Sequence, residues 1–181
     1  MNFRKKNILE LERVSTDEFK TQAKTPLILV LDNVRSALNV GSAFRTADGF
    51  ALTKIYLCGI TAQPPHKEIL KTAIGATESV AWEYCEDPLA AIEALKAEGW
   101  QVLAIEQAEN STSLELYAPP LDAKLAIVFG NEVSGVSDEV MEVVDGALEI
   151  PQFGTKHSLN IAVCVGIVVW DLFVKLKTPK G

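Results

Sequence analysis

The chain has 181 residues, of which 48% are hydrophobic and 23% are charged, so it is long enough to form one compact domain with a sizeable core. The apolar run at residues 161–170 is too short to span a membrane and the charged N-terminus lacks a signal-peptide pattern, so we expect a cytoplasmic protein. A formal net charge of −7 argues against a polyanionic partner, and three scattered cysteines with two histidines argue against a disulfide framework and a metal cluster.

The predicted elements alternate between strands and helices after an N-terminal segment. Residues 1–25 are predicted to form an amphipathic helical extension with Ile8, Leu9, Leu11 and Val14 on one side, ended by Pro26. Five or six short apolar strands then follow, at residues 27–31, 54–58, 80–84, 101–105, 125–129 and 147–150. Helices are expected at residues 42–50, 66–73, 87–99 and 137–144 and at the C-terminus. This alternation predicts an α/β domain whose parallel sheet is covered on both faces.

Polar clusters follow two of these strands. In NVGSAFR at residues 39–45, Arg45 lies one helical turn after Gly41, although a cap, a tight turn and a solvated charge explain the same pattern. In GNEVSG at residues 130–135, Glu132 comes directly after a buried strand, although an ordinary strand-to-helix loop also explains it. Because open α/β sheets bind ligands at the carboxyl ends of their strands, both loops are candidate sites, as is the long connection at 106–122.

A third cluster, KHSLN, stands at the head of the most apolar run of the chain. Ser158 and Asn160 are explained either by a helix start, with Ser158 as the N-cap residue, or by a ligand held at the free amides of that helix end. The chain has no glycine fingerprint for dinucleotides and no phosphate-binding loop. A nicotinamide or flavin oxidoreductase is therefore a distant alternative.

Taken together, NVGSAFR (39–45), IVFGNEVSG (127–135) and IPQFGTKHSLNIAVCVGI (150–167) resemble, in order and spacing, the three motifs of the SpoU, or TrmH-like, RNA 2′-O-ribose methyltransferases of the SPOUT superfamily. The segment KTAIGATES (71–79) also resembles the family's stretch between the second and third strands, and the resemblance spans residues 27–175. It implies a six-stranded parallel sheet with helices on both faces, a deep C-terminal trefoil knot, a homodimer and bound S-adenosyl-L-methionine. On this basis residues 1–25 are an N-terminal helical extension and residues 26–181 the methyltransferase domain.

The resemblance also implies site residues. The expected catalytic residues are Arg45, Asn39, Glu132, Ser158 and Asn160. Because arginine stays protonated in proteins, we expect Arg45 to clamp a phosphate and stabilise alkoxide charge rather than to act as a free base. The expected cofactor-binding residues are Leu103, Ala104, Phe129, Gly130, Asn131, Glu132, Ile150, Pro151, Ser158 and Leu159, and no metal is implied.

The implied substrate is a tRNA or rRNA, and the alternative is a catalytically inactive SPOUT-fold module that binds RNA or cofactor. Residues 1–71 contain 11 Lys and Arg against 7 Asp and Glu, whereas residues 72–181 contain 6 against 17, so one end of the molecule is expected to be positive. An acidic protein with a basic N-terminal helix explains the same distribution. The candidate RNA contacts are Arg4, Lys5, Lys6, Arg13, Arg35, Lys175, Lys177 and Lys180.

Overall fold

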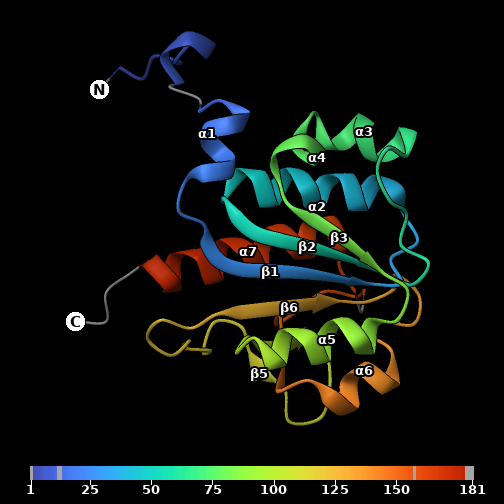
Figure 1. Ribbon diagram of the computed structural model, residues 1–181. Helices are drawn as coiled ribbons and strands as arrows, with labels where there is room; N and C mark the ends of the chain where they lie inside the picture. The colour runs from blue at the N-terminus through green and yellow to red at the C-terminus, as the bar shows by residue number, and fades with distance from the viewer. Residues whose placement is uncertain (1, 12–13, 157, 178–181) are drawn as a thin grey trace.

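The computed structural model of the chain describes residues 2–11, 14–156 and 158–177. Its centre is a seven-stranded sheet in the order β3-β2-β1-β6-β4-β7-β5, with every pair of neighbours parallel (Figure 1). The strands are β1 (Thr25–Asp32), β2 (Leu52–Cys58), β3 (Trp82–Cys85), β4 (Gln101–Ile105), β5 (Thr112–Ser113), β6 (Leu125–Phe129) and β7 (Gly146–Glu149). The predicted α/β class and parallel sheet are therefore confirmed.

Helices cover both faces of the sheet. They are η1 (Ile8–Leu11), α1 (Thr16–Thr21), α2 (Ala37–Gly49), α3 (Lys67–Ala73), α4 (Ala76–Ser79), α5 (Pro88–Ala97), α6 (Asp138–Val143) and α7 (Ile161–Lys177). Figure 1 shows α5 and α6 on one face and α2 and α7 on the other, with α3 and α4 packed outside α2. None of the described helices is long and apolar enough to cross a bilayer.

The central strands are apolar on both faces because both are buried. Along β1, Leu29 and Leu31 pack in the core with α2 and α7, whereas Ile28 and Val30 pack with α5 and α6. A continuous apolar run of this kind is typical of a buried parallel strand, in which side chains alternate between two covered faces. Packing on both faces holds the strands in place and so positions the loops at their carboxyl ends.

Two expectations about the fold are wrong in detail. The sheet has seven strands rather than six, because two residues of the long connection, β5, pair with β7 through Thr112 and Leu148. The N-terminal segment is not one helix: the Ser15 and Glu18 side chains form a capping box that starts the separate six-residue α1. Leu11 and Val14 are exposed, whereas Phe19 of α1 is buried in the main core; the side chains of Ile8 and Leu9 lie outside the described part of the chain.

The strand order places several loop ends at one edge of the sheet. β6 lies between β1 and β4, although it follows both in the sequence, and β7 lies beyond β4. The carboxyl ends of these four parallel strands therefore meet at the same edge, where α2 also begins. An edge at which the strand order changes direction is where open α/β sheets bind ligands.

Candidate functional site

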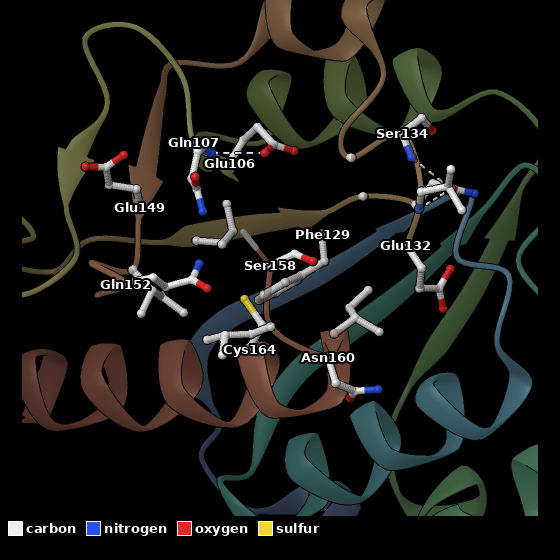
Figure 2. A pocket seen from close by; sticks show the side chains of 18 residues that line it. Glu106, Gln107, Phe129, Glu132, Ser134, Glu149, Gln152, Ser158, Asn160 and Cys164 are labelled. Atoms are coloured by element: carbon white, nitrogen blue, oxygen red, sulfur yellow. Dashed lines mark hydrogen bonds between the residues drawn. The ribbon is translucent and has the colours of Figure 1, made fainter. Parts of the chain in front are cut away.

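A cavity of about 610 Å³ opens at this edge, and its volume is typical of a small-molecule site. Apolar side chains line it, namely Ile105, Phe129, Ile150, Leu159 and Ile161. Figure 2 shows Glu149 and Gln152 at one end and Glu132 at the other, with Phe129 and Ser158 between them. The cavity therefore fits an elongated ligand that has an apolar part and polar ends.

The Glu132 carboxylate links the loop after β6 to the first turn of α2. Its Oε2 accepts a hydrogen bond from the backbone N–H of Arg35 at 2.8 Å. Its Oε1 accepts the backbone N–H of Ser36 and the side-chain amide of Asn39, both at 3.0 Å. The Asn39 Oδ1 accepts a hydrogen bond from the side-chain amide of Asn160 at 3.3 Å. The structure thus brings together one predicted catalytic residue from each of the three motifs.

These contacts keep Glu132 ionised. Burial acts to raise the pKa of its carboxyl, but the hydrogen bonds from the Arg35 backbone, the Asn39 side chain and the Ser36 backbone outweigh it and lower the pKa below its usual value. Glu132 is therefore ionised and accepts hydrogen bonds at neutral pH. Its negative charge is stabilised by the free backbone N–H groups at the start of α2, as acidic groups generally are at helix N-termini.

The cap of α7 is Asn160 rather than the expected Ser158. α7 begins at Ile161, and the Asn160 Oδ1 accepts the backbone N–H of Ala162 at 2.9 Å and of Val163 at 3.4 Å. Ser158 lies two residues before the cap, forms no hydrogen bond with a described residue and lines the cavity. Asn160 therefore has two roles, to start the helix and to hold Asn39.

Replacing Asn160 by alanine is expected to lower the free energy of unfolding by about 1 kcal/mol, because the first amides of α7 lose their acceptor. Urea unfolding followed by circular dichroism measures this loss. Ser158→Ala is the matched control and should change stability by less than about 0.5 kcal/mol. An equal loss in both variants would contradict the assignment of the cap.

The loop between β6 and α6, which presents Glu132, is fixed by carboxylates from two neighbouring strands. Glu106, directly after β4, accepts the backbone N–H of Val136 at 3.1 Å. Asp32, the buried last residue of β1, accepts the backbone N–H of Ser137 at 3.0 Å and its hydroxyl at 2.8 Å. These bonds hold the loop against the sheet and so fix the backbone that carries Glu132.

Gly130, the first residue of this loop, has no room for a side chain. A Cβ there would lie 2.1 Å from both the Gly135 carbonyl carbon and the Val136 nitrogen, which are backbone atoms that cannot rotate away. We expect Gly130→Ala to destabilise the chain by about 1–3 kcal/mol and to weaken ligand binding in the cavity. Urea unfolding and calorimetric titration measure the two effects. Gly154→Ala is the control, because a Cβ there meets nothing within 4 Å.

The structure places most of the predicted cofactor-binding residues at the cavity. Its lining includes Phe129, Gly130, Asn131, Glu132, Ile150, Ser158 and Leu159. Leu103 and Ala104 do not reach it, because both are buried inside β4 and the lining starts at the next residue, Ile105. Pro151 lines a smaller adjoining hollow instead.

Arg45 is not at the cavity of the single chain. It lies on α2, about 9 Å along the helix axis from Asn39, and its side chain is exposed. It forms no hydrogen bond or ion pair with a described residue, so it is the one predicted catalytic residue that the structure leaves apart from the others. Its position leaves it accessible to a large ligand that covers α2.

Several residues that line the cavity were not predicted, among them Gln107, Glu149 and Cys164. The signal for Gln107 was its place just after a predicted strand. Burial raises the pKa of the Cys164 thiol to about 12, and the nearby Glu106 charge adds to the effect, so this thiol stays protonated and acts as an apolar contact. No group of three described His, Cys, Asp or Glu side chains is arranged to hold a metal ion.

Comparisons with known proteins agree with this geometry. Residues 26–170 match the profile of the SpoU rRNA Methylase family. The chain is 28% identical to the tRNA (guanosine(18)-2′-O)-methyltransferase of Borreliella burgdorferi, over 95% of this chain and 80% of that protein. It is 30% identical to the 23S rRNA (guanosine-2′-O-)-methyltransferase RlmB of Vibrio parahaemolyticus, over 90% of this chain and 64% of that protein.

The chain also has a fold similar to that of a solved structure. The AdoMet-bound rRNA methyltransferase from Sinorhizobium meliloti superposes with a TM-score of 0.77 at 27% identity, over 92% of this chain and 62% of that one. The chain thus spans less than two thirds of the Vibrio and Sinorhizobium proteins. Because the family profile covers nearly all of the sheet, the cavity and α7 as far as Trp170, this chain belongs to the SpoU rRNA Methylase family.

Proposed function

We propose that this chain transfers a methyl group from S-adenosyl-L-methionine to a ribose 2′-hydroxyl of a tRNA or rRNA. One observation carries the proposal: Asn39, Glu132 and Asn160, one from each motif, are hydrogen-bonded together at the end of a cavity of about 610 Å³. The names of the Borreliella and Vibrio relatives support RNA as the substrate. The proposal assigns the activity to residues 26–181, with residues 1–25 as an extension, and places the protein in the cytoplasm, where these RNAs are modified.

The cavity residues suit this cofactor. Ile105, Phe129 and Ile150 offer apolar surface for an adenine ring. The carboxylates of Glu106 and Glu132 also line the cavity, and they favour a ligand that carries positive charge. Gly130 lines the cavity with its main chain alone, and Ser158 adds a hydroxyl between the two ends.

When bound, the cofactor supplies a methyl group on a positively charged sulfur, which is a strong electrophile. The chain therefore has to orient the ribose hydroxyl and stabilise the oxygen as it loses its proton. Asn39 and Glu132 hold each other in place at the start of α2, Asn160 donates to Asn39, and Ser158 lines the cavity. We assign these four residues to orienting the ribose.

Arg45 completes the proposed site from the RNA side. Its guanidinium is protonated at any working pH and can grip a phosphate with two parallel hydrogen bonds. Because Arg45 is exposed about 9 Å from Asn39 along α2, we place the backbone of the RNA across this part of the helix. We propose that Arg45 binds the phosphate next to the reacting ribose and stabilises the negative charge that develops on the ribose oxygen.

The proposal includes a homodimer and a knotted C-terminal segment. The outward face of α7 carries Val163, Ile167, Trp170 and Val174 at helical spacing, and Trp170 is 57% exposed. An apolar stripe of this kind supports self-association. The path of the chain supports threading, because Leu114, in the connection between β4 and β6, contacts both the Glu149 backbone and Lys175 of α7.

The test is methyl transfer to RNA from cells that lack the gene. The purified chain, labelled S-adenosyl-L-methionine and bulk tRNA or rRNA are incubated, and the digested nucleosides are analysed by mass spectrometry. We expect one 2′-O-methylated nucleoside that the starting RNA lacks. Binding of the cofactor by calorimetry without transfer to either RNA would overturn the proposed activity in favour of an inactive binding module.

A further inference from the structure

The outward face of α3 differs from that of an ordinary surface helix. Lys67, Leu70, Lys71 and Ile74 follow one another at helical spacing and are all exposed, Leu70 by 44% and Ile74 by 66%. A solvated face would be polar throughout, whereas this one alternates cations with large apolar side chains. Neither lysine forms a hydrogen bond or ion pair with a described residue, and Glu68 is the exposed carboxylate on the same helix.

Ile74 is also held in an unusual backbone conformation. It ends α3 with φ +48°, in the left-handed region that β-branched residues rarely adopt. A residue that is strained and exposed adds little to the stability of the fold itself, and strain of this kind concentrates at binding sites. Ile74 lies in the segment KTAIGATES, for which the proposed reaction has no role.

This face continues onto α2 and so reaches the functional site. α3 packs directly on α2 at Gly41, where a Cβ would lie 2.1 Å from the Thr72 hydroxyl, and this hydroxyl donates to the Leu38 carbonyl at 2.9 Å. Leu38 and Arg45 lie on the same side of α2 as Gly41 and are exposed beside the contact. Leu38 is the neighbour of Asn39, which holds Glu132.

We propose that this surface, the α2–α3 patch (Leu38, Arg45, Lys67, Leu70, Lys71 and Ile74), is where the substrate RNA docks on the catalytic domain. This inference rests on the proposed function, which requires RNA binding but does not identify the surface that binds the RNA. Three cations in an otherwise acidic chain bind phosphates, and the apolar side chains between them contact ribose and base faces. The outward stripe of α7 has four apolar residues and no lysine among them, so it suits a second protein chain, whereas the α2–α3 patch suits a polyanion.

Several other cations that could contact RNA already interact with groups of the chain itself. Arg4 pairs with Glu10, Lys175 pairs with Asp171, and the Lys177 ammonium lies over the ring of Phe173. These three candidate RNA contacts are thus already engaged within the chain. Arg13 and Lys180 lie outside the described residues. The cations of the α2–α3 patch, like Lys5, Lys6 and Arg35, are exposed and form no ion pair with a described residue, and in the patch they are grouped with exposed apolar side chains.

The experiment measures binding of fluorescent bulk tRNA and of fragmented bulk rRNA at several salt concentrations. For Lys67→Ala/Lys71→Ala we expect about 25-fold weaker binding at 0.1 M salt and a salt slope lower by about 1.4, because each lost phosphate contact removes about 0.7 from a slope measured on single strands. Leu70→Ser/Ile74→Ser should bind about fivefold more weakly with the slope unchanged, because it removes only apolar contact. Cofactor affinity should equal that of the parent in both variants.

The matched control is Lys20→Ala/Lys124→Ala, which removes two exposed lysines from other parts of the chain and should leave RNA affinity unchanged. If the parent methylates RNA and the α3 variants bind it with parental affinity and slope, the docking surface is overturned while the proposed function stands. The proposed docking surface would also be overturned if these variants dissociated a dimer without losing RNA binding, because the patch would then be a contact between two copies of the chain. If the parent neither binds RNA nor transfers methyl, both proposals fail together.

Discussion

Replacing Glu132 by glutamine is expected to slow methyl transfer about 100-fold, which is the usual cost of a small misplacement of catalytic groups. The carboxylate accepts the backbone N–H groups of Arg35 and Ser36 and the side chain of Asn39. A carboxamide has one acceptor oxygen, so at least one of these donors loses its partner and its NH₂ group faces another donor. Single-turnover transfer at saturating cofactor measures the effect. Glu142→Gln, an exposed carboxylate on α6, is the matched control and should react at the parental rate.

The same substitution should change how stability depends on pH. Because the pKa of Glu132 is lowered in the folded chain, its carboxylate stabilises the fold above the pKa of an unfolded glutamate, about 4.3, and this contribution is lost as the pH falls through the lowered value. The difference in unfolding free energy between parent and Glu132→Gln should therefore be constant from pH 7 to about pH 5 and shrink at lower pH. A difference that grew on acidification would show that the carboxylate is not stabilised by these bonds.

Arg45→Ala is expected to reduce methyl transfer by about 100- to 1000-fold, the range found when one group that stabilises transition-state charge is removed. Its affinity for S-adenosyl-L-methionine should stay within about twofold of the parent, because Arg45 does not line the cavity. Arg45→Lys should remain strongly impaired, since an ammonium cannot form the two parallel bonds of a guanidinium. Initial rates with RNA and calorimetry with the cofactor separate the two effects.

Arg4→Ala is the matched arginine control, because Arg4 is paired with Glu10 in the N-terminal segment and should leave the rate unchanged. Turnover by Arg45→Ala at the parental rate would remove this residue from the mechanism. Equal losses of rate and cofactor affinity would show that Arg45 supports the fold of the site rather than the RNA.

The sheet could be predicted from the sequence because its strands are short runs of Val, Ile and Leu that stay buried on both faces. The runs at 101–105 and 125–129 match β4 and β6 residue for residue. β5 could not be predicted, because two residues have no periodicity and pair only once β7 is in place. The N-terminal segment was predicted as one continuous helix, although Ser15 and Glu18 form a capping box that starts a new helix, and this pattern is visible in the sequence.

The candidate site was predicted from motifs more than from local physics. Asn39, Glu132 and Asn160 meet as the resemblance implies, but no pattern within one segment indicates a contact between residues so far apart in the chain. Leu103 and Ala104 do not line the cavity, because a strand's last buried residues look the same in sequence as the first residues of its ligand loop. The catalytic roles of all five predicted residues stay predictions, because they depend on the RNA and the cofactor.

The hydrogen bond between Asn160 and Asn39 joins the last fifth of the chain to its first quarter. During translation, α2 and the loop that carries Glu132 leave the ribosome well before Asn160 does. Contacts of such high sequence separation form late, because the chain between them must first be ordered. A nascent or truncated polypeptide that stops before residue 160 lacks Asn160, Ile161 and Cys164 of the cavity lining, so we expect the site to be complete only once the final helix is synthesised and docked.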